Sequence, residues 1–224
     1  MKVLYALSDI DIVLSENHIG TLFIENMMYF RQTLMELLHQ TMGSDGHWVI
    51  TEEQQHIDCK KSVILVTDFF QLEGNQRTIL SKLQAYLTSV ADEEQALLYE
   101  INDTLQRLYH KIIIQAPIEV GYKEFLTAQD LIKAGDFRFE LDNLDLLERV
   151  VTYLDIISDL LKSKLIILVN LRKYMTEEEL KLVYKHCICK KIRIFCIESG
   201  YSCKSIDESL ETIYTVDNDL CFIY

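Results

Sequence analysis

Short, continuous runs of apolar residues mark the predicted strands of this chain. Three such runs occupy Lys61–Thr67, Lys164–Asn170 and Lys191–Ile197, and runs of this kind are typical of strands covered on both faces. A helical pattern lies between the second and third runs. Thr176 and Glu179 have the spacing of a capping box, and apolar residues then repeat at i, i+3, i+4 and i+7: Leu180, Val183, Tyr184 and Cys187. This strand–helix–strand order predicts an α/β fold with a parallel sheet.

The N-terminal region predicts further strands. Val3–Leu7 and Ile10–Leu14 are short apolar segments that fit an antiparallel hairpin. Thr21–Glu25 fits another strand, followed by a helix through Met27–Gln40. The chain therefore begins, as well as ends, with α/β patterns.

The middle of the chain has a different periodicity. Apolar residues are spaced 3-4-3-4 along two segments, each about 21 Å long if helical: Leu98, Ile101, Leu105, Leu108 and Ile112, then Leu147, Val150, Leu154, Ile157 and Leu161. Such seams are what packed long helices require. They fit either a helical hairpin with solvated acidic faces or an extended leg that meets other subunits. We therefore expect a discontinuous α/β head over 1–90 and 161–224, and a helical leg over 91–160.

Composition and charge limit the class of protein. Of 224 residues 49% are hydrophobic, which is ample for a core, and the formal net charge is −13. Charge alone predicts repulsion from DNA and from anionic membranes. The charge is unevenly spread, because residues 91–160 hold 15 acidic and 6 basic side chains, whereas residues 161–224 hold 9 and 10. With no apolar run long enough to span a membrane, we expect a soluble, cytoplasmic protein.

Catalytic motifs are absent from the sequence, which has no GxGxxG, GxxxxGK[ST], GxSxG or HExxH pattern. The loop after the first buried run contains one glycine, Gly74, and no Lys–Ser/Thr pair, so it cannot form a phosphate loop. Asp68 and Asn170 follow buried runs, the usual place for site residues in α/β sheets, although such residues commonly only cap loops. They leave open a nucleotide-binding or hydrolysing enzyme.

Potential metal ligands are few. The main cysteine cluster lacks the two-residue spacing of a zinc knuckle, so we expect structural thiols: Cys187, Cys189, Cys196 and Cys203 near His186. Glu119, Glu124 and Asp130 could offer oxygens to a hard cation such as calcium, or form a solvated acidic surface. The basic residues are scattered, and Lys190, Lys191 and Arg193 make too short a group to be called a basic patch.

The order of segments resembles the small adaptation protein of type II-A CRISPR loci (the Csn-two family). The resemblance runs over nearly the whole chain and is carried by VILVTDFFQLEGNQRTILSKL (63–83), AQDLIKAGDFRFE (128–140), LKSKLIILVNLRKYMTEEEL (161–180) and VDNDLCFIY (216–224). It implies a head that resembles a degenerate P-loop-like fold without nucleotide chemistry, and a long helical leg. It also implies a homotetrameric ring, held in shape by calcium, that takes double-stranded DNA from a free end without sequence preference. The implied role is spacer acquisition beside the CRISPR integrase subunits and the effector nuclease.

Site residues are carried over position by position. Asp130 matches an acidic position of the family's calcium cluster, Glu124 is assigned to the same cluster, and Glu119 joins it by proximity. This chain has non-acidic residues where several of the family's acids would fall, at 120–123, so main-chain carbonyls or other acids would have to complete a calcium site. Lys133 matches a basic position of the family. We infer that the remaining residues of the DNA-binding lining are Lys60, Lys61, Arg77, Lys82 and Lys162.

The resemblance, together with the absence of catalytic motifs, thus predicts a non-enzymatic ring protein that binds the ends of double-stranded DNA. One alternative is a nucleotide enzyme that uses Asp68, Gly74 and Asn170. Another is a protein-interaction scaffold of the adaptation complex whose acidic leg docks basic partners.

Overall fold

The computed structural model describes residues 1–141 and 143–223. Its residue contacts divide the chain into two compact units, the head (Met1–Glu73 and Leu141–Tyr224) and the leg (Gly74–Glu140). The boundaries differ from the expected 1–90, 91–160 and 161–224. The region from residue 77 packs within the leg, whereas the second predicted seam, 147–161, packs in the head.

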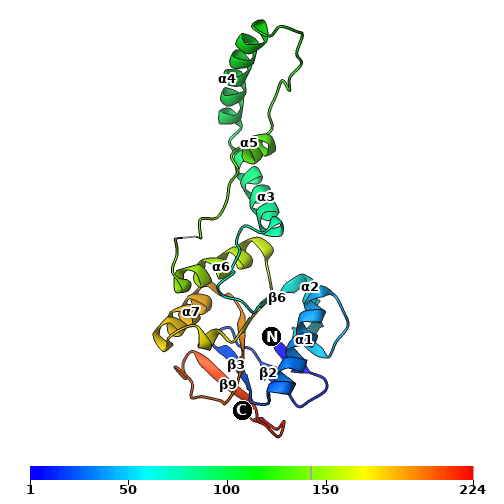
Figure 1. Ribbon diagram of the computed structural model, residues 1–224, viewed down its shortest axis with the longest axis vertical. Coiled ribbons are helices and arrows are strands. Elements are labelled where there is room, and N and C mark those ends of the chain that lie inside the picture. Colours follow the sequence, from blue (N-terminus) through cyan, green and yellow to red (C-terminus); the bar gives the residue numbers. More distant parts are fainter. Residues whose placement is uncertain (142, 224) are drawn as a thin grey trace. The chain divides into compact units, whose positions relative to one another are not determined.

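The larger sheet of the head has six strands, in the order β10-β9-β3-β8-β7-β6. Neighbouring strands are parallel throughout, except that β10 runs antiparallel to β9. The prediction of a mainly parallel α/β sheet is therefore confirmed. The strands are β3 (Ile19–Ile24), β6 (Val63–Val66), β7 (Leu165–Val169), β8 (Ile194–Ser199), β9 (Glu211–Val216) and β10 (Phe222–Ile223) (Figure 1).

A second, four-stranded sheet is antiparallel, in the order β2-β1-β4-β5. It contains the expected N-terminal hairpin together with two strands that the sequence did not reveal. Its strands are β1 (Lys2–Tyr5), β2 (Asp11–Val13), β4 (Trp48–Glu52) and β5 (Gln55–His56).

One core lies between the small sheet, helix α1 (Met27–Met42) and one face of the large sheet. Alternate strand residues enter this core, among them Ile167 of β7 and Phe195 of β8, as the two-residue period of a strand requires. The indole Nε1 of Trp48 donates to the carbonyl oxygen of Thr33 over 2.9 Å, which ties the small sheet to α1. The expected helix through Met27–Gln40 is confirmed.

Helices α7 (Glu177–Lys190) and α6 (Leu146–Leu161) pack against each other in the head. The predicted capping box of α7 is present, with Thr176 as N-cap and Glu179 as its partner. Tyr184 of α7 lies within hydrogen-bonding distance of Cys196, which alternates with Phe195 and so points to the opposite face of the sheet. The second apolar seam is therefore a helix, as predicted, but its buried side chains complete the head.

The leg consists of α3 (Arg77–Glu93), α4 (Gln95–Ile114) and α5 (Ala128–Ala134). The first apolar seam is confirmed as helix α4. Two reciprocal hydrogen bonds between Asn75 and the main chain of Phe139, 2.8 and 2.9 Å long, join the two ends of this unit. Within the described residues, no helix is both long and apolar enough to cross a membrane.

The observed boundaries change the distribution of charge. The leg, residues 74–140, carries 10 acidic and 7 basic side chains, and the head carries 25 and 15. Most of the acidic excess therefore belongs to the head. The expected strongly acidic leg is wrong, because residues 141–160, with five acids and one base, fold with the head.

Candidate nucleic-acid interface

Seven basic residues lie where three neighbouring parallel strands begin. The starts of β6, β7 and β8 are held side by side, since the Lys164 N–H donates to the Ser62 carbonyl over 2.8 Å and the Ile166 N–H donates to the Arg193 carbonyl over 2.9 Å. The strands share this edge because they are parallel and adjacent in the sheet. We call the set the basic edge: Lys60, Lys61, Lys162, Lys164, Lys190, Lys191 and Arg193.

Local structure explains why these side chains reach solvent. Lys60 and Lys61 lie on a one-turn helix, α2 (Cys59–Ser62), whose N-cap is Asp58. Lys162 and Lys191 end helices α6 and α7 in left-handed conformations, with φ of 51° and 58°. Positive charge at these positions also complements the partial negative charge of a helix C-terminus. The basic edge is thus built from the residues that end helices and begin strands.

Acidic side chains neutralise part of the basic edge. Glu52 pairs with Arg193 and, over 3.1 Å, with Lys164. Hydrogen bonds from Arg193 and then Lys164 hold the pKa of Glu52 below its usual value. Arg193 also pairs with Glu16 over 3.0 Å. These pairs join the large sheet to the strand β4 and to the loop after β2.

Three lysines of the basic edge remain free to meet a ligand. Lys61 lies 3.5 Å from Asp58 and Lys190 lies 4.0 Å from Asp155. In contrast, Lys60, Lys162 and Lys191 form no ion pair with any carboxylate that the structure describes, and all three are exposed. Unpaired, exposed lysines are the side chains best placed to bind phosphate oxygens.

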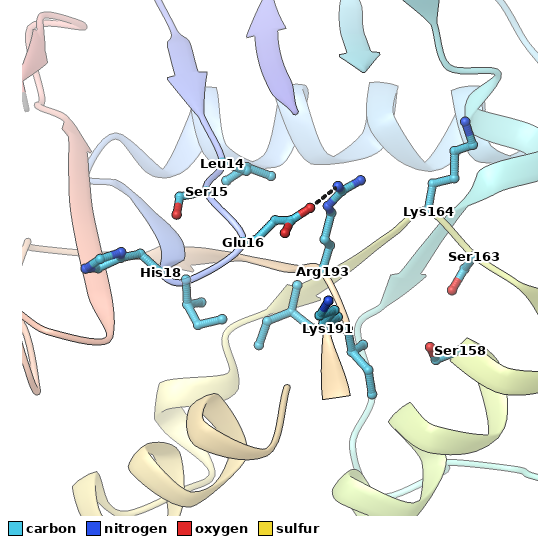
Figure 2. Close-up of a pocket in the computed structure, with 12 residues that line it drawn as sticks. Leu14, Ser15, Glu16, His18, Ser158, Ser163, Lys164, Lys191 and Arg193 are labelled. Carbon is cyan, nitrogen blue, oxygen red and sulfur yellow. Dashed lines mark hydrogen bonds and ion pairs between the residues drawn. The ribbon is translucent and has the colours of Figure 1, made fainter. Parts of the chain in front are cut away.

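A hollow of about 220 Å³ opens in the basic edge (Figure 2). Figure 2 shows Arg193 paired with Glu16 there, with Lys191 beside them. The hydroxyls of Ser15, Ser158 and Ser163 also line the hollow. The Ser163 hydroxyl oxygen is buried and has no hydrogen-bond partner among the described residues. Hydroxyl and ammonium donors of this kind can bind the oxygens of a phosphate.

The predicted DNA-binding residues fall into two groups. Lys60, Lys61 and Lys162 belong to the basic edge, whereas the other three are exposed residues of the leg: Arg77 at the start of α3, Lys82 within α3 and Lys133 in the last turn of α5. Four basic residues of this edge were not assigned to the predicted lining: Lys164, Lys190, Lys191 and Arg193. The last three were judged too short a group to be a basic patch. The sequence feature that could have indicated these residues is that basic residues precede each buried run. Only the parallel arrangement of the strands shows that they lie at one edge of the sheet.

The predicted metal ligands do not converge. No group of three or more His, Cys, Asp or Glu residues suited to a metal ion occurs in the described part of the chain. Glu119 and Glu124 are exposed, and Oδ2 of Asp130 accepts hydrogen bonds from Thr127 and Lys123. The residues expected to hold calcium therefore do not fit a calcium site within one chain.

Two of the four cysteines in the predicted cluster fit structural thiols. Cys187 and Cys196 are fully buried, and burial raises the pKa of the Cys187 thiol to about 12. Cys189 and Cys203 are exposed and belong to no metal cluster in the described residues.

Residues at the opposite edge of the sheet serve to close turns. Asp68 Oδ1 accepts the N–H groups of Phe70 and Gln71 over 2.9 and 3.2 Å. Asn170 Oδ1 accepts both the N–H and the hydroxyl of Ser199 over 2.8 Å, which ties the end of β7 to the end of β8. The side chains that would serve a nucleotide enzyme are therefore engaged in capping loops.

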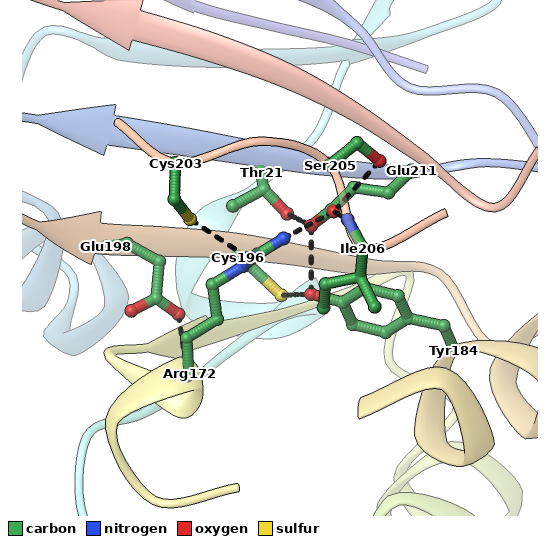
Figure 3. A network of polar contacts seen from close by, with 9 residues as sticks. All are labelled: Thr21, Arg172, Tyr184, Cys196, Glu198, Cys203, Ser205, Ile206 and Glu211. Atoms are coloured by element: carbon green, nitrogen blue, oxygen red, sulfur yellow. Dashed lines mark hydrogen bonds and ion pairs between the residues drawn. The ribbon is translucent and has the colours of Figure 1, made fainter. Parts of the chain in front are cut away.

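A buried polar network fixes strand β9 against the rest of the sheet (Figure 3). Glu211, at 3% exposure, pairs with Arg172. Its other oxygen accepts the hydroxyls of Thr21 over 2.6 Å and Tyr184 over 3.1 Å. Nearby Glu198 accepts the Arg172 N–H over 3.1 Å, and burial raises the pKa of Glu198 to about 7. Because the Glu211 side chain is buried and its oxygens are hydrogen-bonded, we assign this network to the stability of the head.

Comparison with known proteins gives a match to a family model and a likeness in fold to solved structures. An ATP-binding cassette of an ABC transporter, in its ADP conformation, is 12% identical, with a TM-score of 0.48 over 97% of this chain and 85% of that chain. A likeness this weak supports no inference about function. The model of the family described as CRISPR-associated protein (Cas_Csn2) matches residues 40–220, a span that takes in the basic edge and the whole leg. The chain belongs to this CRISPR-associated protein family.

Proposed function

We propose that this chain acts in CRISPR adaptation by binding double-stranded DNA at free ends, without sequence preference, as a homotetrameric ring. Family membership supports the role in adaptation. The observation that carries DNA binding is the basic edge, because it gathers seven positive side chains on three adjacent strands of a chain whose net charge is −13. Local charge, rather than total charge, governs contact with a phosphate backbone.

The chemistry of the basic edge suits a sequence-independent contact. Lysine ammonium groups bind phosphates as point charges, and phosphate contacts fix position on a duplex without reading bases. The parallel sheet holds the three strand starts at fixed spacing, so the charges are organised before DNA arrives. In a ring, four copies of this edge would act on one duplex.

The leg offers a surface for assembly. Helix α4 exposes an apolar stripe along one side, with Leu97, Ile101, Leu108 and Ile112 between 42% and 56% exposed. Their spacings of four and seven residues place them on one side of the helix. An exposed apolar stripe of this length is typical of an interface, and the proposal assigns it to a second copy of the chain.

The proposal describes the protein as non-enzymatic, with a head that corresponds to a degenerate P-loop-like fold. In support, Asp68 and Asn170 cap turns rather than face an open site, and the sequence lacks a phosphate loop. The proposed partners besides DNA are the CRISPR integrase subunits and the effector nuclease, and the proposed location is the cytoplasm. Calcium is left out of this proposal because Glu119, Glu124 and Asp130 do not converge.

The test compares linear and covalently closed circular duplexes of equal length in a gel-shift titration at several salt concentrations. The ring predicts binding to the linear duplex, little binding to the closed circle, and affinity that falls steeply with salt. Equal affinity for both duplexes would exclude threading over ends. Calorimetry with ATP and Mg²⁺ addresses the enzyme alternative, and measurable nucleotide binding would count against the proposal.

A further inference from the structure

One oxygen of the Asp130 carboxylate, Oδ2, accepts from three donors of its own chain. It accepts the N–H of Thr127 over 2.8 Å and the Thr127 hydroxyl over 2.6 Å. The Lys123 ammonium donates to the same oxygen. Thr127 and Asp130 form the capping box of α5. The hydrogen bond from Lys123, and then those from Thr127, hold the pKa of Asp130 well below its usual range.

Lys123 is held near Asp130 by the segment in which it lies. Residues 122–126, here called the strap, run along one side of helix α4. Main-chain groups of the strap bond to α4, with Leu126 bonded in both directions to the Asn102 amide over 2.7 and 3.0 Å. The Glu124 carbonyl accepts from the Gln106 amide over 2.9 Å. Lys123 lies in the middle of this fixed segment.

Aromatic contacts secure both ends of the strap. The rings of Tyr122 and Tyr109 lie 5.2 Å apart, and those of Phe125 and Tyr99 lie 5.8 Å apart. Asn102 and Gln106 lie on the same side of α4 as these two tyrosines, at spacings of three and four residues. The contacts that define the path of the strap therefore involve neither the Glu119 nor the Glu124 carboxylate.

Charge repulsion within the leg is also modest. The leg carries 10 acids against 7 bases, and a divalent cation is not required to offset so small an excess. Calcium needs six to eight oxygens. Of the three predicted ligands, Glu119, Glu124 and Asp130, only Asp130 forms an ion pair with a described residue, and that residue is Lys123.

We infer that the Lys123 ammonium takes the place of a divalent cation at Asp130, so that the leg keeps its fold without calcium. A tethered ammonium supplies positive charge to the carboxylate. Unlike a metal ion, it does so without losing a shell of water ligands and without needing further protein ligands. The consequence for assembly, a ring that persists in chelator, rests on the proposed function; the consequence for the fold of the leg does not.

The experiment measures thermal unfolding and solution mass with excess calcium and with excess chelator. We expect the same Tm and mass for the wild type in both. Lys123→Met should lower the Tm by roughly 1–3 °C, since exposed ion pairs contribute little. Lys123→Glu places a second carboxylate beside Asp130 and should lower the Tm further. Addition of calcium should then raise the Tm of this variant, unlike that of the wild type.

Lys111→Met is the matched control, because Lys111 is an exposed lysine of α4 with no ion pair among the described residues. It should behave as the wild type. A wild-type Tm that rises with calcium, or calcium binding that is lost in Asp130→Asn, would overturn the inference. A wild type that is monomeric in both conditions would instead count against the ring and leave the Tm comparison intact.

Discussion

The main-chain N–H of Lys164 donates to the carbonyl oxygen of Ser62 over 2.8 Å, which joins segments that are about a hundred residues apart in the sequence. This bond aligns the start of β7 with the start of β6. It therefore brings Lys164 and Lys162 beside Lys60 and Lys61. Four of the seven residues of the basic edge depend on this one register.

Removing the unpaired lysines of the basic edge should weaken DNA binding. The triple variant combines Lys60→Gln, Lys162→Gln and Lys191→Gln. Its affinity for DNA should fall, and the steepness of log K against log[salt] should decrease by about 1 for each lost phosphate contact. The measurement is a gel-shift titration across salt concentrations. A triple variant at Lys181, Lys185 and Lys204, which lie elsewhere in the head, should retain both affinity and slope. An unchanged slope in the first variant would show that DNA binds elsewhere.

Glu52→Gln should move stability and DNA affinity in opposite directions. The substitution removes the negative charge shared by Lys164 and Arg193. Lys164 then becomes available to phosphates, while Arg193 keeps its ion pair with Glu16, and affinity rises. Stability at pH 7 falls by about 1 kcal/mol, because the ion pairs are lost. Since the pKa of Glu52 is lowered in the folded state, its contribution is present above the unfolded pKa and disappears as pH falls. Urea denaturation at pH 7 and pH 4 should therefore show a smaller difference between variant and wild type at pH 4.

Arg172→Met should destabilise the head strongly. It leaves the buried carboxylate of Glu211 without its charged partner, and breaking one side of a buried ion pair costs about 3–5 kcal/mol. Thr21→Val removes only one hydroxyl donor from the same carboxylate and should cost about 1 kcal/mol. Urea denaturation of both variants provides the comparison. Equal losses would mean that Arg172 does not hold β9 in place.

Glu198→Gln should flatten the pH dependence of stability. Burial raises the pKa of Glu198 from 4.5 to about 7, so between these values the folded protein keeps a proton that the unfolded chain has released. Wild-type stability therefore falls as pH rises through this window, by up to about 3 kcal/mol. Glutamine cannot ionise, so the free energy of unfolding of the variant, relative to that of the wild type, should increase between pH 5 and pH 8. The exposed Glu178→Gln is the control, and parallel curves for Glu198→Gln and wild type would contradict the assignment.

Polar substitutions in the apolar stripe of α4 should reduce assembly. Leu108→Ser with Ile112→Ser removes two exposed apolar side chains, so the mass in solution should fall while helix content changes little. Glu100→Ser with Lys111→Ser, on the adjacent polar side of α4, should leave the mass unchanged. Sedimentation equilibrium measures the mass, and circular dichroism checks the helix. A full-mass Leu108/Ile112 variant would place the interface elsewhere.

Much of the fold was predictable because it depends on local periodicity. The buried runs gave β6, β7 and β8, and the spacing of Thr176 and Glu179 gave the start of α7. Periodicity does not say what a helix packs against, which is why the seam over 147–161 was assigned to the leg although Val150, Leu154 and Ile157 are buried in the head.

The candidate site was less predictable for a related reason. The sequence shows Lys61, Lys164 and Lys191 as separate residues, each before a buried run, and nothing in their spacing states which strands are neighbours. The order β8-β7-β6 is what turns them into one surface. The occupied state of Asp130 was equally hidden, because the path of residues 122–126 along α4 depends on side-chain contacts with Asn102 and Gln106.

The parallel sheet also separates the two ends of its strands into regions that can change independently. Strand β7 has five residues, so its ends lie about 16 Å apart, with a fully buried interior between them. Turns fastened by Asp68 and Asn170 close one end, and charge gathers at the other. Substitutions in the turns at one end of the strands, or of the lysines at the other end, can therefore alter one region while the buried interior between them stays unchanged.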